Sequence, residues 1–498
     1  MMKKHTVRFE PIGRVYEVTH GSPLHDLIHE YGVEFPCGGE GTCGGCKVKL
    51  LNGFINLDDH HRALLNKQRL DDTWRLACLS YITEDVTLEV HQYESLILAD
   101  NTVFSFVPQS GHGIAVDLGT TTLVAQLIDL ANGHVLDVQT AMNAQSRFGA
   151  DIMSRVLHAL DAEGAAQLTG MIREQIGGMV AELLKNKKTD LQKILIVGNS
   201  VMHHLFCGID VKPLSAYPFE SPDTAGKTFT PSELGWNLDA KVRVTFMPNI
   251  GSFVGSDILA GIFASSIHKS EKYIALIDLG TNGEIVVGNK NKLVCASTAA
   301  GPAFEGTNIS MGMKATTGAI SSVHLHEGKI HAHVIGNASP RGICGSGLID
   351  AVSALLETGD IDIAGQISGD REKIAVAGDV FLNQKDFREF QLAKAAIAAG
   401  LDILIRHLGI THADVEKIYI AGAFGTFINL QNTINLGMLE FPAEKISKLG
   451  NSALIGAKMF LFNNTAQDEI LPLCSHISLE SDKNFQDVYV GKMFFMVM

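Results

Sequence analysis

Most of this chain takes its fold from the segment Gly113-Ile114-Ala115-Val116-Asp117-Leu118-Gly119-Thr120-Thr121-Thr122-Leu123-Val124. Its apolar start, its glycine–threonine turn and its apolar continuation to Asp129 predict two strands joined by a tight turn. The same pattern returns over residues 273–287, where Asp278 stands 161 positions after Asp117. A repeat of this kind rarely arises by chance, and it predicts a duplicated α/β unit.

Each copy places an Asp at the end of an apolar strand and a Gly–Thr step two residues later. Backbone N–H groups and hydroxyls of such a turn can donate hydrogen bonds to phosphate oxygens. Asp117 and Asp278 supply carboxylate oxygens, which bind Mg2+ directly or through its waters. We therefore predict a triphosphate site between the copies, although a plain hairpin would explain either copy alone. The predicted phosphate-binding residues are Gly119, Thr120, Thr121, Thr122, Gly280, Thr281, Asn282, Gly283 and Glu284.

A third segment, residues 418–425, combines a strand with a glycine-rich turn. Glycines at such a turn allow a purine and a ribose to approach the backbone closely. The order and spacing of the three segments resemble the phosphate-1, phosphate-2 and adenosine motifs of the acetate and sugar kinase/Hsp70/actin superfamily. The resemblance implies an ATPase domain with an RNase H-like α/β fold. The residues that it assigns to adenosine are Gly422, Ala423, Phe424 and Gly425.

Two further segments fit this architecture. Residues 193–200 predict a buried strand that ends at a Gly–Asn–Ser turn, and residues 453–459 resemble the small-residue helix that connects the subdomains. We divide the ATPase domain, residues 113–498, into a first subdomain at about 113–270, a second at about 271–445, and a connecting helix with the C-terminal segment at about 446–498.

Three further residues are candidates for the site, although a purely structural role explains each of them as well. Asp257 could orient a hydrolytic water as a carboxylate in the cleft, but capping a helix is the commoner use of such an Asp. Gly345 and Ser346 open a predicted helix over residues 348–356. The N-terminus of that helix could bind an anion or could simply be a helix start.

The first hundred residues contain four cysteines, three of them in the glycine-rich run 36–46. Their C-x5-C-x2-C spacing, followed by a lone fourth cysteine, is close to that of single [2Fe–2S] ferredoxins. Glycines in the run let backbone N–H groups approach cluster sulfurs without clashes. Zinc sites usually have two short C-x2-C pairs, so a zinc site is less favoured, and disulfides still less. The predicted cluster ligands are Cys37, Cys43, Cys46 and Cys78.

The segments around these cysteines predict a small α+β domain. Ser22, followed by Pro23, predicts the start of a helix that continues to Tyr31. This order of elements resembles the β-grasp fold of [2Fe–2S] ferredoxins. We place a ferredoxin-like domain at residues 1–94 and a linker at residues 95–112. The predicted strands are residues 6–10, 15–18, 47–50 and 86–90, with a Cys78-bearing segment at 75–79.

The composition favours a globular protein with several domains. The chain has 498 residues, 46% of them hydrophobic, and a formal net charge of −14, without a run of Lys or Arg that would follow a phosphate backbone. We therefore expect no nucleic-acid partner. The first residues alternate polar and apolar side chains rather than forming a leader peptide, and no stretch of 18 apolar residues could cross a bilayer. We expect a cytoplasmic protein without a membrane partner.

The pairing of these two domains, together with four local strings, resembles the ATP-dependent reductive activators of corrinoid proteins. The resemblance extends over nearly the whole chain. One departure is expected, because some members carry a middle domain between linker and ATPase domain, and residues 90–113 leave no room for one. The four strings are residues 117–122, 249–257, 299–306 and 429–437.

The resemblance implies that the protein restores a corrinoid (cobalamin-binding) protein of an anaerobic methyltransferase system whose cobalt has oxidised to Co(II). One electron from an external low-potential electron donor would pass through the [2Fe–2S] cluster to Co(II) and regenerate Co(I). A plant-type [2Fe–2S] cluster has a reduction potential of about −400 mV, and the Co(II)/Co(I) couple lies lower, so the transfer is uphill. Turnover of ATP with Mg2+ would favour it. Catalytic roles fall to Asp117, Asp257 and Asp278. The likeness also suggests a possible homodimer.

Three other functions stay open on the residues alone. A small-metabolite kinase with a regulatory iron–sulfur domain would need a base near the γ-phosphate, for which Asp257 is the candidate. An actin-like or chaperone-like ATP switch would use the cluster only structurally. An activator of radical dehydratases would bridge a [4Fe–4S] cluster between two subunits with few cysteines, which the four cysteines of one ferredoxin-like domain disfavour.

Overall fold

The fold is described from a computed structural model of the chain. Cys37, Cys43 and Thr281 lie outside the described residues, as does the first part of the predicted linker. None of the helices in the described ranges is long and apolar enough to span a membrane. The structure describes residues 3–10, 14–28, 41, 46–67, 70–89, 104–149, 151–185, 187–221, 223–280, 282–315, 318–335 and 339–496.

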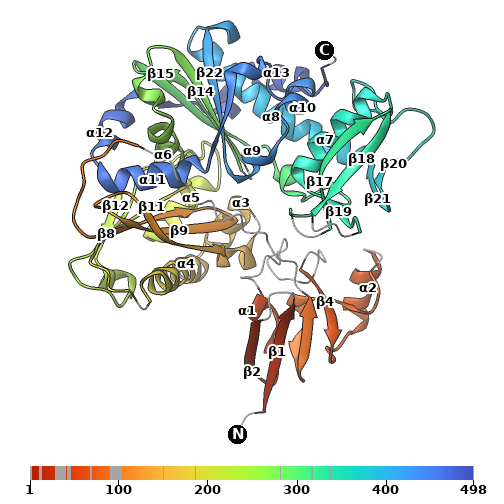
Figure 1. Ribbon diagram of the computed structural model, residues 1–498, viewed down its shortest axis with the longest axis horizontal. Helices are drawn as coiled ribbons and strands as arrows, with labels where there is room; N and C mark the ends of the chain where they lie inside the picture. Colours follow the sequence, from red (N-terminus) through yellow and green to blue (C-terminus); the bar gives the residue numbers. More distant parts are fainter. Residues whose placement is uncertain are drawn as a thin grey trace.

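The first large sheet has six strands in the order β10-β9-β8-β11-β13-β12 (Figure 1). Its first three strands in the chain form an antiparallel meander, and β11 then adds parallel to β8. Apolar side chains of α4 (Ala162–Leu184) and α5 (Ser200–Cys207) pack on it, and we call this sheet with its helices lobe one. Its strands are β8 (His112–Leu118), β9 (Thr122–Asp129), β10 (Val135–Met142), β11 (Leu191–Gly198), β12 (Lys227–Phe229) and β13 (Arg243–Phe246).

The second large sheet repeats this plan in the order β23-β22-β14-β15-β16-β24. Its meander is again antiparallel, and β22 adds parallel to β14, as β11 does to β8. The predicted duplication is therefore confirmed, and we call this sheet with the elements packed on it lobe two. Its strands are β14 (Tyr273–Leu279), β15 (Gly283–Asn289), β16 (Lys292–Thr298), β22 (Val415–Ala421), β23 (Ile446–Gly450) and β24 (Cys474–His476).

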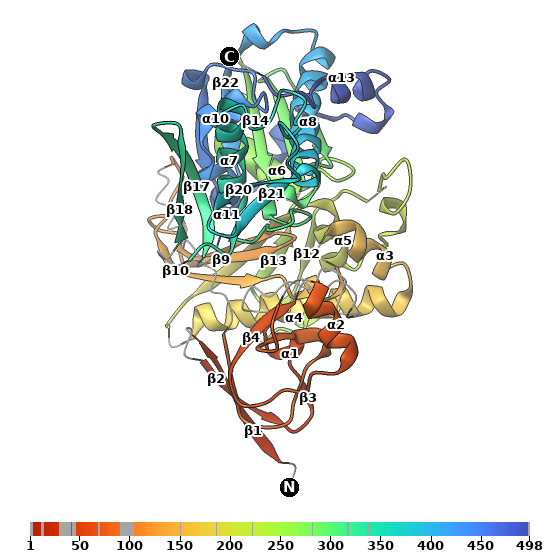
Figure 2. The same cartoon turned by 90° about the vertical axis from the view of Figure 1, so that its right-hand side faces the viewer.

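Two helices cross between the lobes, α6 (Ser256–Ser265) and α11 (Ser452–Phe462). A Cβ on Gly456 would lie 2.0 Å from Ala260 O, so the crossing requires a glycine there. One buried apolar cluster joins these helices to both sheets. The predicted connecting helix over residues 453–459 is confirmed as part of α11, which packs between the two lobes (Figure 2).

Smaller elements build out lobe two around its sheet (Figure 1). A three-stranded sheet and a hairpin flank α7, and α8 packs on the meander. These elements are β17 (Ala319–His326), β18 (Lys329–Val334), β19 (Gly342–Ile343), α7 (Gly345–Glu357), β20 (Lys373–Ala377), β21 (Val380–Asn383), α8 (Gln384–His407), α9 (Ala423–Phe427), α10 (Leu430–Asn435), α12 (Ala466–Ile470) and α13 (Phe485–Gly491).

The ferredoxin-like domain has a five-stranded sheet in the order β2-β1-β7-β4-β5. Alternate residues of β1 point inward, and Val7 and Phe9 enter the apolar core, as the alternation of polar and apolar side chains from Thr6 onward dictates. The predicted strands are confirmed where the structure describes them. The elements are β1 (Lys4–Glu10), β2 (Arg14–Thr19), β3 (Ser22–Pro23), α1 (His25–Ile28), β4 (Lys47–Asn52), α2 (Asp59–Lys67), β5 (Trp74–Leu76), β6 (Tyr81–Ile82) and β7 (Val86–Glu89).

The predicted start of the first helix is wrong. Ser22 and Pro23 form the short strand β3, which pairs antiparallel with β6, and the helix begins only at His25. The distant pairing partner, about 60 residues later in the chain, overrides the local helix signal. Tyr31, the predicted end of this helix, lies outside the described residues.

The second half of the predicted linker packs on the ATPase part of the chain. The rings of Phe104 and Phe106 contact the Phe462 ring at the end of α11, with centroids 5.5 and 4.3 Å apart. Gln109 Nε2 donates to Phe462 O at 2.9 Å, and Lys193 Nζ donates to Gln109 Oε1 at 2.7 Å. Residues 104–109 are therefore anchored at both their aromatic and their polar side chains.

Candidate ATP and cluster sites

The first Asp of the repeat stands at the end of β8 in lobe one. Asp117 is half-buried, and Asn451 Nδ2 donates a hydrogen bond to Asp117 Oδ2 at 2.8 Å. Burial raises the pKa of Asp117 to about 6, and the hydrogen bond from Asn451 opposes part of this shift. At pH 7 the carboxylate is therefore ionised, as binding to Mg2+ requires.

The turn after Asp117, residues Gly119–Thr122, is called turn one. Asn143 holds it at two points, because its backbone N–H donates to Thr121 O and its Nδ2 donates to Gly119 O, both at 2.9 Å. A Cβ on Gly119 would lie 2.5 Å from Thr122 O, so this tight turn excludes any side chain at that position. The side chains of Thr121 and Thr122 are half-buried.

Two more polar side chains hold the middle of turn one. Asn199, which caps α5, donates from Nδ2 to Thr120 Oγ1 at 2.8 Å. Arg155, fully buried in α3 (Ile152–His158), donates from Nη2 to Thr120 O at 2.6 Å. Burial lowers the pKa of Arg155 to about 9, so it still carries a positive charge at pH 7. Turn one is therefore preorganised by side chains from three other segments.

The second Asp of the repeat stands at the end of β14 in lobe two. Ser452 Oγ donates to Asp278 Oδ2 at 3.3 Å, a longer contact than the one at Asp117. Burial, and after it the charge of Asp117, raise the pKa of Asp278 to about 7. Asn451 and Ser452 are consecutive at the start of α11, so one helix end contacts both aspartates.

The turn after Asp278, residues 280–284, is called turn two. Gly280 N donates to Asn282 O at 3.0 Å, and Gly283 begins β15. Glu284 is buried, and Ser297 Oγ donates to Glu284 Oε1 at 3.2 Å. Burial is the main cause that raises the pKa of Glu284 well above its usual value, and the charges of Asp257 and Asp278 add to it.

Asp257 does not have the capping role that we considered more common for it. Gly255 is the residue that precedes α6 as its cap, and Asp257 is the second residue of the helix, where its Oδ1 accepts from Ile258 N at 2.8 Å. Burial, with the charges of Asp278 and Asp117, raises the pKa of Asp257 to about 8. A carboxyl group with such a pKa is mostly protonated at pH 7, and its ionised fraction is a stronger base than an ordinary carboxylate.

Asp117, Asp257, Asp278 and Glu284 are called the acidic cleft group. In the part of the chain that the structure describes, no three His, Cys, Asp or Glu side chains converge closely enough to hold a metal ion by themselves. Carboxylate oxygens are ligands of the kind that Mg2+ takes together with waters and phosphate oxygens. Such an ion would also favour the charged form of these carboxyl groups, whose pKa values are raised chiefly by burial.

The third predicted motif meets turn two directly. Gly422, with φ +87°, caps α9, and a Cβ there would lie 2.6 Å from Leu279 O and 2.7 Å from Asp278 Oδ1. Ala423 is the first residue of α9, and a Cβ on Gly425 would lie 2.7 Å from Ile420 Cγ2. The close approach of Gly422 to Asp278 brings the predicted adenosine and phosphate segments together.

The aromatic ring of this motif has one face covered. Phe424 stacks on Phe304, with ring centroids 5.2 Å apart and planes 18° apart. Gly345, at the start of α7, lies against the Phe304 carbonyl group and the Phe424 ring, because a Cβ there would come within 1.9 Å of Phe304 O and 2.7 Å of Phe424 Cε2. Ser346 is buried and donates from Oγ to Ser321 O at 2.8 Å. Gly345 thus supports the Phe424 ring, and the Ser346 hydroxyl is engaged by backbone.

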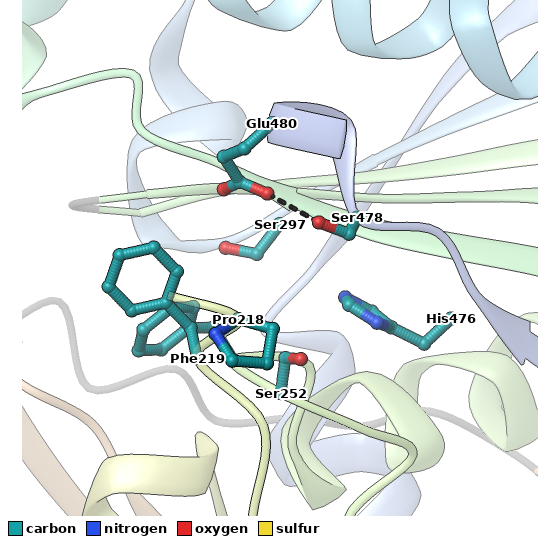
Figure 3. Close-up of a pocket in the computed structure, with 8 residues that line it drawn as sticks. Pro218, Phe219, Ser252, Ser297, His476, Ser478 and Glu480 are labelled. Carbon is teal, nitrogen blue, oxygen red and sulfur yellow. Dashed lines mark hydrogen bonds between the residues drawn. The ribbon is translucent and has the colours of Figure 1, made fainter. Parts of the chain in front are cut away.

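A narrow pocket lies between the lobes (Figure 3). None of the site residues that we predicted from the sequence is among the residues that line it. Ser297 joins it to the acidic cleft group through its hydrogen bond to Glu284. On its far side Ser478 Oγ donates to Glu480 Oε2 at 2.9 Å, and burial lowers the pKa of His476. The lining residues are Pro218, Phe219, Ser252 and Phe253 before β14, and Ser297, His476, Ser478 and Glu480 after it.

Several residues of the ATP site were not found from the sequence. Asn143, Arg155, Asn451 and Ser452 each contact a turn or an aspartate of the repeat from a distant segment. The local signal for Asn451 is its place before α11, where its Oδ1 accepts from Leu454 N as a helix cap. A cap signal of this kind locates the helix start but does not predict the contact with Asp117.

Two of the four predicted cluster ligands lie in the described residues, and they meet. Cys46 Sγ and Cys78 Sγ are 3.1 Å apart, well beyond the about 2.05 Å of a disulfide. The backbone N–H of Cys78 points at Cys46 Sγ, with 3.4 Å between N and S. Two cysteine sulfurs that lie this close together, one of them with an N–H donor, can ligate the same iron of an iron–sulfur cluster as thiolates. Cys37 and Cys43 lie outside the described residues.

Three family models match successive parts of the chain. A 2Fe-2S iron-sulfur cluster binding domain matches residues 7–83. The RACo middle region matches residues 112–270, and the C-terminal domain of RACo, described as the ASKHA domain, matches residues 272–498. The expected absence of a middle domain is therefore wrong. The middle region is present as the part of the chain that forms lobe one, and not as an insertion between linker and ATPase domain.

Similar proteins cover most of the chain. The corrinoid activation enzyme RamQ of Eubacterium limosum is 34% identical over an alignment 463 residues long, and the match covers 85% of this chain and 78% of RamQ. A reductase of the Co(II) methylated amine-specific corrinoid protein of Methanosarcina barkeri is 26% identical over 77% of this chain and 76% of its own. A solved structure described as a reductive activator for corrinoid, iron-sulfur protein aligns with a TM-score of 0.69 and 26% identity, over 99% of this chain and 98% of its own.

Proposed function

Because the chain belongs to the family of reductive activators of corrinoid proteins, we propose that it uses ATP to reduce the Co(II) corrinoid of a partner protein to Co(I) for methyl transfer. The observation that carries this proposal is the presence of two sites in one chain. Cys46 and Cys78 meet in the ferredoxin-like domain, and the acidic cleft group lies between the lobes. One site suits electron transfer and the other suits ATP hydrolysis.

The cysteines define the electron-transfer site. Cys46 and Cys78, with Cys37 and Cys43 as the proposed remaining ligands, would hold a [2Fe–2S] cluster, which supplies a one-electron carrier. Cys46 is buried and Cys78 is half-buried, so the protein shields one sulfur from water more than the other. The N–H of Cys78 stabilises negative charge on Cys46 Sγ, since a hydrogen bond to a thiolate favours its charged form.

For the ATP site we propose that turns one and two donate backbone N–H groups to phosphate oxygens. Asp117 and Asp278 would bind Mg2+ through its waters, and Gly422 would bring the α9 segment, with Ala423, Phe424 and Gly425, to the nucleoside. Asp257 would accept a proton from the attacking water, as its raised pKa allows. We assign Gly345 and Ser346 a supporting place behind the Phe424 ring.

ATP can drive an uphill reduction only if it binds two conformations of the protein with different affinity. The two lobes supply such conformations, because Asp117 belongs to lobe one and Asp278 to lobe two. A Mg2+–triphosphate between them changes the charge balance across the cleft. A corrinoid protein that prefers one arrangement of the lobes would then be bound or released according to the nucleotide.

We also propose an electron source, a compartment, an oligomeric state and domain boundaries for this protein. The electron would come from an external low-potential donor, and the protein would be cytoplasmic and homodimeric, without nucleic-acid or membrane partners. The unbridged neighbours Cys295 and Cys474 support a reducing compartment. The proposed units are the ferredoxin-like domain 1–94, the linker 95–112 and the ATPase domain 113–498, divided near residues 270 and 445.

The decisive experiment mixes the protein anaerobically with a Co(II) corrinoid protein, a reductant and ATP, and follows the Co(I) absorption. Wild type should form Co(I) only with ATP. Cys46→Ser should form none while still binding ATP, and Cys207→Ser, a half-buried cysteine of lobe one, should behave as wild type. ATP-independent Co(I) formation would contradict the proposal, and ATPase activity that responds to a small metabolite instead would favour the kinase.

A further inference from the structure

Two ion pairs connect the ferredoxin-like domain, seen below the lobes in Figures 1 and 2, to lobe one and to lobe two. Arg147 of lobe one forms an ion pair with Asp26 of α1, with Nη2 and Oδ1 2.7 Å apart. Arg341, which precedes β19 on lobe two, approaches Glu89 at the end of β7 to 3.8 Å between Nη1 and Oε1. Positive charge on the lobes thus meets negative charge on the ferredoxin-like domain at two separate points.

Arg147 lies on a short 3-10 helix, Ala144–Phe148, whose first end is bonded to turn one. Asn143 caps this helix, since its Oδ1 accepts from Gln145 N at 3.0 Å. The same Asn143 side chain donates to Gly119 O of turn one. A single side chain therefore connects the proposed phosphate site to the helix that carries Arg147.

The other end of this 3-10 helix is bonded to turn one as well. Gly149, which follows the helix, accepts a hydrogen bond from Arg155 Nε at 3.0 Å. Arg155 also donates from Nη2 to Thr120 O in turn one. Since both ends of the helix share partners with turn one, a displacement of turn one displaces Arg147.

We propose that Arg147 and Arg341 form a docking surface for Asp26 and Glu89 of the ferredoxin-like domain, and that MgATP in the cleft releases this domain by moving the two arginines relative to each other. The proposal rests on the proposed function only in requiring ATP at the cleft. Arg147 is a positioning residue, because it contacts neither nucleotide nor cluster.

The cleft provides the movement. Asp117 and Asp278 belong to different lobes, and the charge of Asp117 disfavours the charged form of Asp278 across the cleft. A Mg2+ ion with the triphosphate attracts both carboxylates and draws the lobes together. Asp26 and Glu89 belong to one small domain with a single apolar core, so they cannot both follow Arg147 and Arg341 when the distance between the lobes changes. The Glu89–Arg341 pair, already the longer one, is lost first.

The docking is weak enough to be reversible. The four side chains are between a quarter and a half exposed, and an ion pair of this kind shifts an equilibrium by about fivefold at most. Salt screens such pairs, because the Debye length is about 8 Å at physiological ionic strength. Release would free the cluster-bearing domain to reach the corrinoid of a partner protein. By linkage, docking must weaken ATP binding by the same factor as ATP weakens docking.

Hydrogen exchange of the cluster-loaded full-length protein tests this inference without a corrinoid protein or electron transfer. A non-hydrolysable ATP analogue with Mg2+ should speed exchange in residues 22–28 and slow it in turn one. In Arg147→Glu, exchange in residues 22–28 should be fast with or without nucleotide, and the docked fraction should fall about tenfold, since repulsion replaces attraction. The charge-reversed pair Arg147→Glu with Asp26→Arg should restore both protection and its response to nucleotide.

Matched controls separate docking from general charge effects. Lys185→Glu, directly after α4, and Asp59→Arg on α2 make the same charge changes at exposed sites and should leave exchange in residues 22–28 as in wild type. Near-identical exchange of wild type and Arg147→Glu, or no rescue by the reversed pair, would overturn the docking surface. If the nucleotide protects turn one but leaves the exchange rate of residues 22–28 unchanged, the coupling between ATP binding and release of the ferredoxin-like domain is wrong. The proposed function would not be affected by that result.

Discussion

The two copies of the repeat place Asp117 and Asp278 at equivalent positions, but they hold the two carboxylates differently. Turn one is bonded by Asn143, Arg155 and Asn199, all from lobe one. In the second copy, Gly422, the cap of α9, instead lies directly against Asp278. One copy is thus stabilised by polar side chains, and the other is shaped by a close backbone contact from the proposed nucleoside segment.

The copies also differ six residues after each Asp. Leu123 of the first copy is a buried apolar residue, whereas Glu284 of the second is a buried acid bonded to Ser297. Together with Asp257 of α6, Glu284 adds two carboxylates of raised pKa beside Asp278. The two copies therefore share a phosphate turn of similar shape. The two further carboxyl groups of raised pKa, which can take up protons, lie beside the second turn only.

The largest expected effect concerns the feature that the copies share. Asp117→Asn and Asp278→Asn should each lower the turnover of ATP about 100-fold or more, because each removes a charge that stabilises Mg2+ and the transferring phosphate. Steady-state ATPase assays measure this effect. Asp129→Asn, at the opposite end of the first hairpin, should keep most of the activity. Retention of more than a tenth of wild-type turnover in Asp278→Asn would break the equivalence of the two copies.

The second prediction concerns Asp257 and Glu284, the acids beside turn two. It uses the pH dependence of the free energy of unfolding. Asp257 has a pKa near 3.8 when unfolded and about 8 when folded, so its contribution to stability is full below pH 4 and is lost as pH rises to 8. Asp257→Asn should therefore be more stable than wild type by about 2 kcal/mol at pH 8, with little difference at pH 4.

Thermal unfolding of both proteins in chelator, from pH 4 to pH 8, measures this gain. Mg2+ with an ATP analogue should remove the difference, since a bound cation compensates the charge that Asp257 otherwise carries alone. A stability difference that does not change with pH would show that Asp257 titrates as an ordinary carboxyl group, and the asymmetry between the copies would then be smaller than described.

The contact between Gly422 and Asp278 sharpens the comparison further. Gly422→Ala adds a Cβ within 2.7 Å of Asp278 Oδ1 and should weaken ATP binding about tenfold, with a loss of stability of about 2 kcal/mol. Gly359→Ala is the matched control, because Gly359 also has a positive φ, +74°, with nothing within 4 Å of its Cβ position. Equal effects of the two substitutions would assign the cost to backbone conformation alone.

The smallest effect separates the two neighbours at the start of α11. Asn451→Ala removes both a helix cap and a hydrogen bond to Asp117, and should cost about 1–2 kcal/mol of stability. Ser452→Ala removes one longer hydrogen bond to Asp278 and should cost about 0.5 kcal/mol. Denaturant unfolding compares the two variants, and an equal cost would mean that both aspartates are held alike.

Local sequence predicted the elements of the ATP site well, because their signals are local. Asp117 and Asp278 stand at strand ends in both copies, and the helix over residues 453–459 lies within α11. The prediction failed where a distant partner decides. Ser22 and Pro23 became a strand because β6 pairs with them, and Asp257 is not a cap because Gly255 precedes α6.

The residue pattern by itself determined the duplicated strand–turn–strand units, the glycines that their turns demand and the cysteine spacing, because these depend on backbone geometry and ligand chemistry within a few residues. Only the tertiary structure decided which side chains hold each carboxylate and how far its pKa rises. Asn451 reaches Asp117 across 334 residues of chain. Desolvation and charge repulsion depend on neighbours in space, so no local pattern contains them.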